Sequence, residues 1–155
     1  MQKTSIGPRA GPSPSALLAA PDIDGAGTAR GECPRILIVE DDYFVAMALE
    51  HGLKEAGYNV VGIATSASEA IKLAQDCKPV LAIMDIRLGG NSDGIEAAIT
   101  IAKLYNVPSI FATAHADDHT RQRGQAANPR GWVGKPYSPD VVIAAVRAAL
   151  ESYGC

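Results

Sequence analysis

The sequence predicts an α/β fold in which a five-stranded parallel sheet is covered by helices on both faces. From residue 35 onward, short apolar segments alternate with amphipathic segments of helical length, the pattern of successive β-α units. Apolar residues make up 47% of the chain and aromatic residues only 5%, which favours buried aliphatic strands over an aromatic-rich β-sandwich. The 155 residues are enough for one domain with a single core.

Each expected element has its own signals in the sequence. Gly57 ends a helix whose apolar residues recur at helical spacing, and Ser66 begins another, with Glu69 three residues later completing a capping box. Ser138 is the expected cap of the last helix. Five strands joined by right-handed crossovers favour the flavodoxin-like order 2-1-3-4-5. Strands are expected at 35–39, 59–64, 80–84, 109–112 and 131–134, and helices at 43–56, 66–75, 93–104 and 138–152.

The segment between the fourth and fifth strands, 115–127, carries the weakest helical pattern. It contains no large aliphatic residue and includes Gly124. Helices in proteins gain most of their stability from a packed apolar face. We therefore expect a short, mobile or partly unwound helix here, although Asp117 and Arg121 have the favourable spacing for a charge pair.

Residues 1–33 differ in composition from the rest of the chain. They contain four prolines among Gly, Ser, Ala and Thr, without sustained periodicity, which predicts a disordered tail before a domain at 34–155. The apolar segment SALLAA is too short for the centre of a signal peptide. A short helix or docking segment stays open, as does a start codon placed too far upstream.

Charge, hydropathy and cysteine content exclude several classes of function. The net charge of -3 gives no electrostatic reason to expect nucleic-acid binding, and no apolar run is long enough to span a bilayer. The chain has three cysteines that lie far apart, so neither a disulfide framework nor a zinc site is expected. We expect reduced thiols in a protein of the cytoplasm. These residues are Cys33, Cys77 and Cys155.

Polar residues stand at the ends of four of the five expected strands. Glu40 and Asp41 follow the first strand, Asp85 the third, Thr113 the fourth and Lys135 the fifth. Parallel strands bring their carboxyl ends to one edge of a sheet, so these side chains should converge. A dinucleotide-binding Rossmann fold is the competing topology. It would place a glycine-rich phosphate loop where this chain has acidic residues that repel a pyrophosphate.

The converging residues suit phosphoryl transfer. Three neighbouring carboxylates must bind protons or a cation, and an all-oxygen site with room for water suits Mg²⁺. With the metal in place, Asp85 can attack a phosphoryl group, and Lys135 and the Thr113 hydroxyl can stabilise its oxygens. Each residue alone has an ordinary explanation as a helix cap, a turn or a strand end, but the ordered combination is hard to obtain by accident.

The segments RILIVEDD, IMDIRLGGNSDG, FATA and GKPY together resemble the motifs of bacterial response-regulator receiver domains, over about 34–152. This resemblance implies that Asp85 is the phosphoacceptor. It also implies that Mg²⁺ is bound directly by Asp41, Asp85 and the backbone carbonyl of Arg87, and through water by Glu40.

The resemblance further implies a conformational switch. Thr113 would be the switch hydroxyl, Lys135 would pair with the acyl phosphate, and Trp132 would occupy the aromatic switch position. FATA followed by KPY is similar to FATGUY-type receivers of alphaproteobacteria, with Ala114 in place of the usual glycine. Two departures stand out: the loop after Asp85 has two glycines and one residue more than usual, and Trp132 replaces the common Tyr or Phe. Simple packing over the sheet edge is the alternative role of Trp132.

Three functions are compared. The leading one is a single-domain response regulator that receives phosphate from a histidine kinase or histidine phosphotransfer protein, and that binds a protein partner or shuttles or drains phosphate. The second is a Mg²⁺-dependent aspartyl-phosphate hydrolase, whose usual acid/base two residues after the nucleophile would here be Arg87. The third is a degenerate receiver used only for binding, which the complete set of motifs disfavours. The cognate kinase, the signal and homodimerisation stay open.

Overall fold

The computed structural model describes residues 33–89, 93–114 and 116–151. They form a five-stranded sheet whose strands pair in parallel in the order β2-β1-β3-β4-β5. This topology confirms the predicted fold class and strand order. The strands are β1 (Arg35–Val39), β2 (Asn59–Ala64), β3 (Leu81–Asp85), β4 (Ser109–Thr113) and β5 (Pro129–Gly134).

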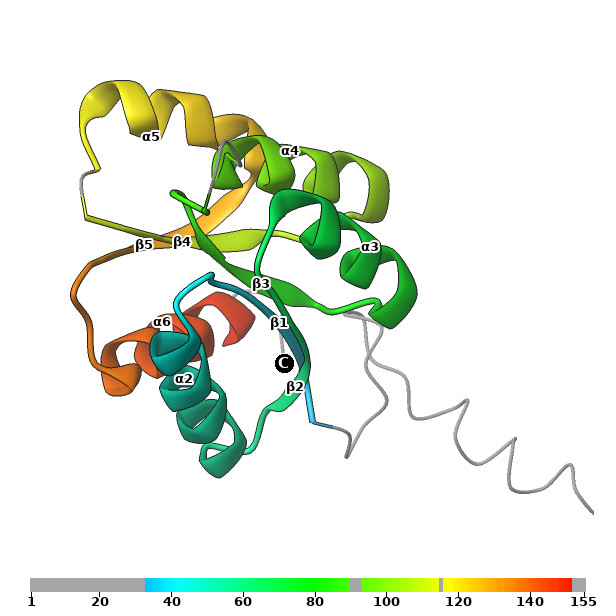
Figure 1. Cartoon of the computed structure of the whole chain (residues 1–155), viewed down its shortest axis with the longest axis vertical. Helices are drawn as coiled ribbons and strands as arrows, with labels where there is room; N and C mark the ends of the chain where they lie inside the picture. Colours follow the sequence, from blue (N-terminus) through cyan, green and yellow to red (C-terminus); the bar gives the residue numbers. More distant parts are fainter. Residues whose placement is uncertain (1–32, 90–92, 115, 152–155) are drawn as a thin grey trace, which may run out of the picture.

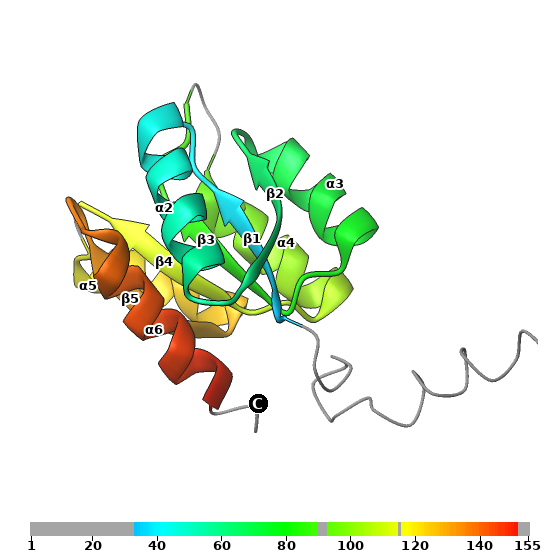
Figure 2. The ribbon, with the colours of Figure 1, turned by 90° about the horizontal axis from the view of Figure 1, so that it is seen from below.

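Helices cover both faces of the sheet (Figure 1). One face carries α2 (Tyr43–Glu55) and α6 (Pro139–Glu151). The other face carries α3 (Ala67–Cys77), α4 (Gly94–Tyr105) and α5 (Asp118–Gly124). In the turned view, α2 and α6 stand in front of the sheet (Figure 2). The strands are therefore buried between two layers of helices, as expected for a doubly wound fold.

Side chains of β1 alternate between two apolar cores, because successive residues of a strand point to opposite faces. Ile36 and Ile38 belong to the core formed with α2 and α6, whereas Leu37 and Val39 belong to the core formed with α3 and α4. All four side chains are at most 1% exposed. A register shift would exchange the two sets, so this packing fixes where the residues after β1 lie.

Two strands end one residue later than the sequence predicts. β3 includes Asp85 and β4 includes Thr113. Asp85 pairs with Ala112, and Thr113 with Gly134, so the parallel ladder continues to the edge of the sheet. Strand pairing therefore fixes the backbone of both polar residues, which the sequence had placed just beyond the strands.

The capping box predicted for α3 forms in a shifted version. Ser66 Oγ accepts a hydrogen bond from Glu69 N at 3.2 Å, as predicted. The Glu69 carboxylate instead accepts a bond from Thr65 N at 2.7 Å. Ser66 has an extended backbone, which brings the preceding amide within reach of the carboxylate. The helix also continues to Cys77, two residues beyond the predicted end.

The segment with the weakest helical pattern folds as the seven-residue helix α5 followed by the 3-10 turn η4 (Gln125–Ala127). The predicted short helix is confirmed, and the change to a tighter turn agrees with the lack of an apolar stripe. The mobility expected for this segment stays a prediction.

The tail predicted at 1–33 lies outside the described residues, apart from Cys33. Among the residues that the structure does describe, no helix is both long enough and apolar enough to cross a membrane.

Candidate functional site

A cavity of about 240 Å³ opens at the carboxyl edge of the sheet. Because β1, β3, β4 and β5 are parallel, they bring residues that are distant in sequence to this edge. The cavity is lined by Glu40, Asp41, Asp42, Asp85, Arg87, Thr113, Ala114 and Lys135. Every predicted site residue except Trp132 therefore contributes to one cavity.

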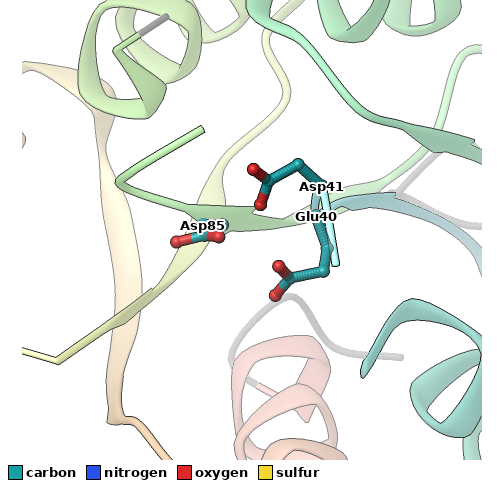
Figure 3. A group of neighbouring side chains, drawn as sticks. All are labelled: Glu40, Asp41 and Asp85. Carbon is teal, nitrogen blue, oxygen red and sulfur yellow. The ribbon is translucent and has the colours of Figure 1, made fainter. Parts of the chain in front are cut away.

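Three carboxylates form an acidic cluster in this cavity. One oxygen each of Glu40, Asp41 and Asp85 lies within 4.8 Å of the others. The carboxyl groups of Asp41 and Asp85 face a common space, with Glu40 beside them (Figure 3). Glu40 and Asp85 are 2% and 4% exposed, whereas Asp41 is open to solvent. At this spacing the carboxylates repel one another unless a proton or cation intervenes.

Lys135 supplies positive charge within the cluster. Its Nζ donates to Glu40 Oε1 at 3.1 Å and to Asp85 Oδ2 at 3.2 Å. The Lys135 amide donates to the carbonyl of Thr113 at 2.8 Å, which ties the lysine to the end of β4. Burial alone would lower the pKa of Lys135, but the charges of Asp85 and Glu40 outweigh it and raise that pKa. The ammonium group therefore stays charged beside Asp85.

Glu40 has a perturbed pKa. Its pKa is raised to about 7, mainly by burial and also by the nearby charge of Asp85, although hydrogen bonds from Asp42 N and Lys135 act to lower it. The bond from Asp42 N measures 3.1 Å. A cation bound beside Glu40 would lower this pKa, since a cation stabilises the ionised form of a carboxyl group.

The loop after Asp85 is closed at its base. Arg87 N donates to Asp85 Oδ1 at 3.2 Å, and Gly94 N donates to the Ile86 carbonyl at 2.9 Å. The backbones of Arg87 and Asp93 pair as an isolated antiparallel bridge. The loop therefore leaves the sheet and returns to the start of α4 beside the residue from which it began.

These residues fit Mg²⁺. Their side-chain ligand atoms are carboxylate oxygens, and the single ammonium group of Lys135 cannot balance three carboxylates. Mg²⁺ prefers oxygen ligands and keeps several waters, for which the cavity has room. Arg87, whose backbone carbonyl is the remaining predicted ligand, lines the same cavity.

The two predicted switch residues lie in different surroundings. Thr113 is 7% exposed and lines the acidic cavity. Trp132 lies on β5, where its ring packs against Phe111 with centroids 4.8 Å apart. The Arg121 guanidinium lies 4.9 Å from the Trp132 ring centroid, within the range of a cation–π contact. Trp132 is half-buried, so its ring is neither fully inside nor fully free.

Two glycines that shape the site were missed in the sequence. A Cβ on Gly94 would lie 2.0 Å from the Asp85 carbonyl oxygen, so the start of α4 packs directly on the backbone of Asp85. A Cβ on Gly89 would lie 3.1 Å from Asp41 Oδ2. Gly94 had a visible signal, since it follows the helix-capping Asp93. Gly89 stood out only as part of a glycine pair.

A comparison with protein families identifies a family for this chain. The model of the response regulator receiver domain matches residues 36–147. The chain is 36% identical over 131 residues to the phyllosphere-induced regulator PhyR of Methylorubrum extorquens, covering 83% of this chain and 48% of PhyR. It is 35% identical over 119 residues to the transcriptional regulatory protein PdtaR of Mycobacterium tuberculosis, covering 77% of this chain and 58% of PdtaR. The chain thus spans about half the length of these curated relatives.

Solved structures agree with this match. A signal receiver domain of a modulated diguanylate cyclase from Desulfovibrio desulfuricans is 36% identical with a TM-score of 0.71, covering 78% of this chain and 96% of that one. The response regulator PhyR from Brucella abortus is 32% identical with a TM-score of 0.67, covering 79% of this chain and 49% of that one. The chain therefore belongs to the response regulator receiver domain family of two-component signalling.

Proposed function

We propose that Asp85 accepts a phosphoryl group from a phosphohistidine of a cytoplasmic histidine kinase or histidine phosphotransfer protein. The observation that carries this proposal is the surroundings of Asp85. Its carboxylate is buried at the end of β3, opens into the acidic cavity and accepts hydrogen bonds from Lys135 and from the Arg87 amide. A carboxylate held in this way is oriented for nucleophilic attack.

The metal would be held by the acidic cluster. Asp41, Asp85 and the backbone carbonyl of Arg87 would bind Mg²⁺ directly, and Glu40 would bind it through water. When bound, Mg²⁺ neutralises the repulsion among the carboxylates and the charge on the phosphoryl oxygens. The donor set, the cavity and the excess negative charge support this assignment.

The transfer itself needs one bond formed and one broken. A carboxylate oxygen of Asp85 forms a bond to phosphorus as the bond to the donor imidazole nitrogen breaks, and that nitrogen keeps the electron pair. Lys135, already within hydrogen-bond distance of Asp85, would stabilise the added negative charge, and the Thr113 hydroxyl would donate to a phosphoryl oxygen. The product is an acyl phosphate on Asp85.

A protein donor is supported by the surface beside the cavity. α2 begins directly after Asp42, and three apolar side chains in its first half are exposed. Phe44 is 81% exposed, Tyr43 67% and Met47 38%. Exposed apolar clusters that are rimmed by polar groups are typical of surfaces that contact other proteins. We propose that the phosphohistidine protein contacts this surface.

Phosphorylation would then move the switch residues. A phosphoryl group on Asp85 would draw the Thr113 hydroxyl towards it and change the space beside β4 and β5. Trp132 belongs to β5, and its ring packs against Phe111 of β4. A change in the space beside these strands would therefore change the position of the ring. The resulting surface would bind a protein partner, or the protein would return or drain phosphate without one.

Asp85→Asn should abolish the Mg²⁺-dependent gain of one phosphoryl group, because an amide is a poor nucleophile and cannot form the acyl phosphate. The measurement is intact mass after incubation with acetyl phosphate and Mg²⁺. Wild-type protein without Mg²⁺ is the control. Equal labelling of wild type and Asp85→Asn would contradict the proposal, and steady release of phosphate without a labelled intermediate would favour the hydrolase.

Asp41→Asn should weaken Mg²⁺ binding more than Glu40→Gln, since only Asp41 is proposed to contact the metal directly. Changing a group that acts on a metal indirectly typically lowers affinity by about 10–100-fold, so loss of a directly bound carboxylate should lower it by at least as much. Calorimetric titration of both variants measures the two effects. The reverse order would show that the ligand assignment is wrong.

A further inference from the structure

Arg123 of α5 links this helix to the start of α4. Its guanidinium forms an ion pair with Asp93 and lies 3.7 Å from Glu96 Oε2. Asp93 and Arg123 are 30 residues apart in sequence. This cationic contact lies outside the acidic cavity, and neither the motifs of the sequence nor the proposed transfer step uses it.

Asp93 stands where the loop after Asp85 ends. Its Oδ1 accepts a hydrogen bond from Ile95 N at 2.9 Å, which caps α4. Its Oδ2 accepts the bond from Arg123. Its backbone pairs with Arg87, whose carbonyl is a proposed metal ligand. The Arg123 guanidinium therefore holds the residue that closes the loop.

The position of Asp93 is passed on to Asp85 by direct backbone contact. The next residue, Gly94, donates its amide to the Ile86 carbonyl and packs against the Asp85 carbonyl with no room for a side chain. A shift of Asp93 must move Gly94, and Gly94 cannot move closer without displacing Asp85. Close-packed interiors transmit such displacements because they hold few voids.

We propose that Arg123 is a positioning residue of the phosphorylation site, which sets the loop carrying Asp85 and Arg87 from the side of α5. The phosphoryl part of this inference rests on the proposed function. The effect is reciprocal, since coupling between two sites acts equally in both directions. Metal or phosphoryl binding at the loop should therefore stabilise the attachment of α5.

A general electrostatic effect of the Arg123 charge can be distinguished from positioning by its contact with Asp93. The Arg123 and Asp93 side chains are 37% and 36% exposed, and ion pairs at such exposure contribute little to overall stability. A general electrostatic effect should be reproduced by removing any exposed arginine, whereas positioning depends on this contact. Arg147 of α6 is exposed on the opposite face of the sheet and provides the matched control.

The test compares wild type with Arg123→Ala, Arg123→Lys, Asp93→Asn, the double variant Arg123→Ala/Asp93→Asn, and Arg147→Ala. Asparagine caps a helix about as well as aspartate, so Asp93→Asn removes the charge and retains the cap. Calorimetry measures Mg²⁺ affinity, and intact mass measures the rate of labelling by acetyl phosphate.

We expect Arg123→Ala and Asp93→Asn each to lower Mg²⁺ affinity and the labelling rate by roughly threefold, near the low end of what a single residue between two coupled sites contributes. Arg123→Lys should restore part of the loss. The double variant should be no worse than either single one, because both remove the same contact. Arg147→Ala should match wild type.

Hydrogen exchange on the metal-free proteins gives a readout that depends neither on Mg²⁺ binding nor on phosphorylation. Loss of the contact should speed exchange at 86–89 together with 118–124. Arg123→Ala with wild-type affinity, rate and loop exchange would overturn the inference, as would equal effects of Arg147→Ala. A wild type that is never labelled would overturn the proposed function instead, while the Mg²⁺ titration and the exchange data would still decide the role of Arg123.

Discussion

The helices α4 and α5 lie on the same face of the sheet and both approach the site, but they are held by different means (Figure 1). α4 buries five residues, and its first residue, Gly94, touches the backbone of Asp85. α5 buries only Gly124, its last residue. Among the contacts of its described residues, some are made by the ends of long side chains, through Arg123 to Asp93 and through Arg121 to Trp132.

This difference assigns the two helices different roles. Backbone contact and a packed apolar face leave α4 no alternative position, so it fixes the site. Contacts made by flexible side chains can be rearranged at low cost, so we expect α5 to be the more adjustable of the two helices. The proposed function needs both parts: a rigid site for phosphoryl transfer, and a surface that responds to it.

Gly94→Ala should give the largest effect, because the new Cβ would meet the Asp85 carbonyl oxygen, a backbone atom that cannot rotate away. We expect a loss of about 3 kcal/mol or more in the free energy of unfolding, at the upper end of overpacking effects. Urea unfolding followed by circular dichroism measures it, and labelling of Asp85 should fall strongly in whatever protein remains folded.

The control is Gly131→Ala in β5, where the nearest heavy atom would lie at an ordinary contact distance of 3.8 Å. If both alanine variants had the same stability and labelling rate, the contact between α4 and Asp85 would not be rigid, and the contrast between the two helices would fail.

The parts of this arrangement that depend on strand order could be predicted from the sequence. Alternating β-α segments place Glu40, Asp85 and Lys135 at one edge, whatever the details of the loops. The contact of Arg123 with Asp93 could not be predicted, since it depends on how far α5 extends and on its rotation about its axis. Side-chain partners between helices are not encoded by local spacing.

The segment around Gly124 shows why rules of helix propensity and side-chain spacing failed to predict the contacts of α5. In the sequence it counts as a helix breaker within a weak segment, where Asp117 and Arg121 have the spacing of a charge pair. In the structure Asp117 caps α5 by accepting a bond from Thr120 N, and Arg121 reaches the Ala116 carbonyl and the Trp132 ring. Gly124 lies so close to Trp132 and Phe111 of the sheet that an added Cβ would come within 3.2 Å of both rings.

Hydrogen exchange should show a difference in local stability between α5 and α4. Amides of α5 in the unphosphorylated protein should exchange roughly a hundredfold faster than those in the middle of α4, because few apolar contacts oppose local opening. Phosphorylation, or beryllofluoride binding, should reduce the difference as the loop stabilises α5. Exchange as slow in 118–124 as in the middle of α4, before phosphorylation, would show that α5 is no more adjustable than its neighbour.

Gly124→Ala should give the smallest of the three effects. Its Cβ would lie 2.8 Å from Trp132 Cη2 and 3.2 Å from Phe111 Cε2, both at the far ends of rings. Rings can tilt away where a backbone carbonyl cannot, so the cost should be about 1–2 kcal/mol. The better helix propensity of alanine offsets part of it, by at most about 1 kcal/mol.

The displaced ring gives a direct signal of this variant, because Trp132 is the only tryptophan in the chain. Its emission should shift in Gly124→Ala, while labelling of Asp85 should stay within about twofold of wild type, because the Trp132 ring can move to accommodate the new methyl group.

Trp132→Phe removes the ring edge nearest Gly124, so the double variant Gly124→Ala/Trp132→Phe should lose less stability than the sum of the single variants. Additive losses would mean that the ring does not take up the strain. In that case α5 would be packed against the sheet as tightly as α4, and the two helices could not have the separate roles inferred from their contacts.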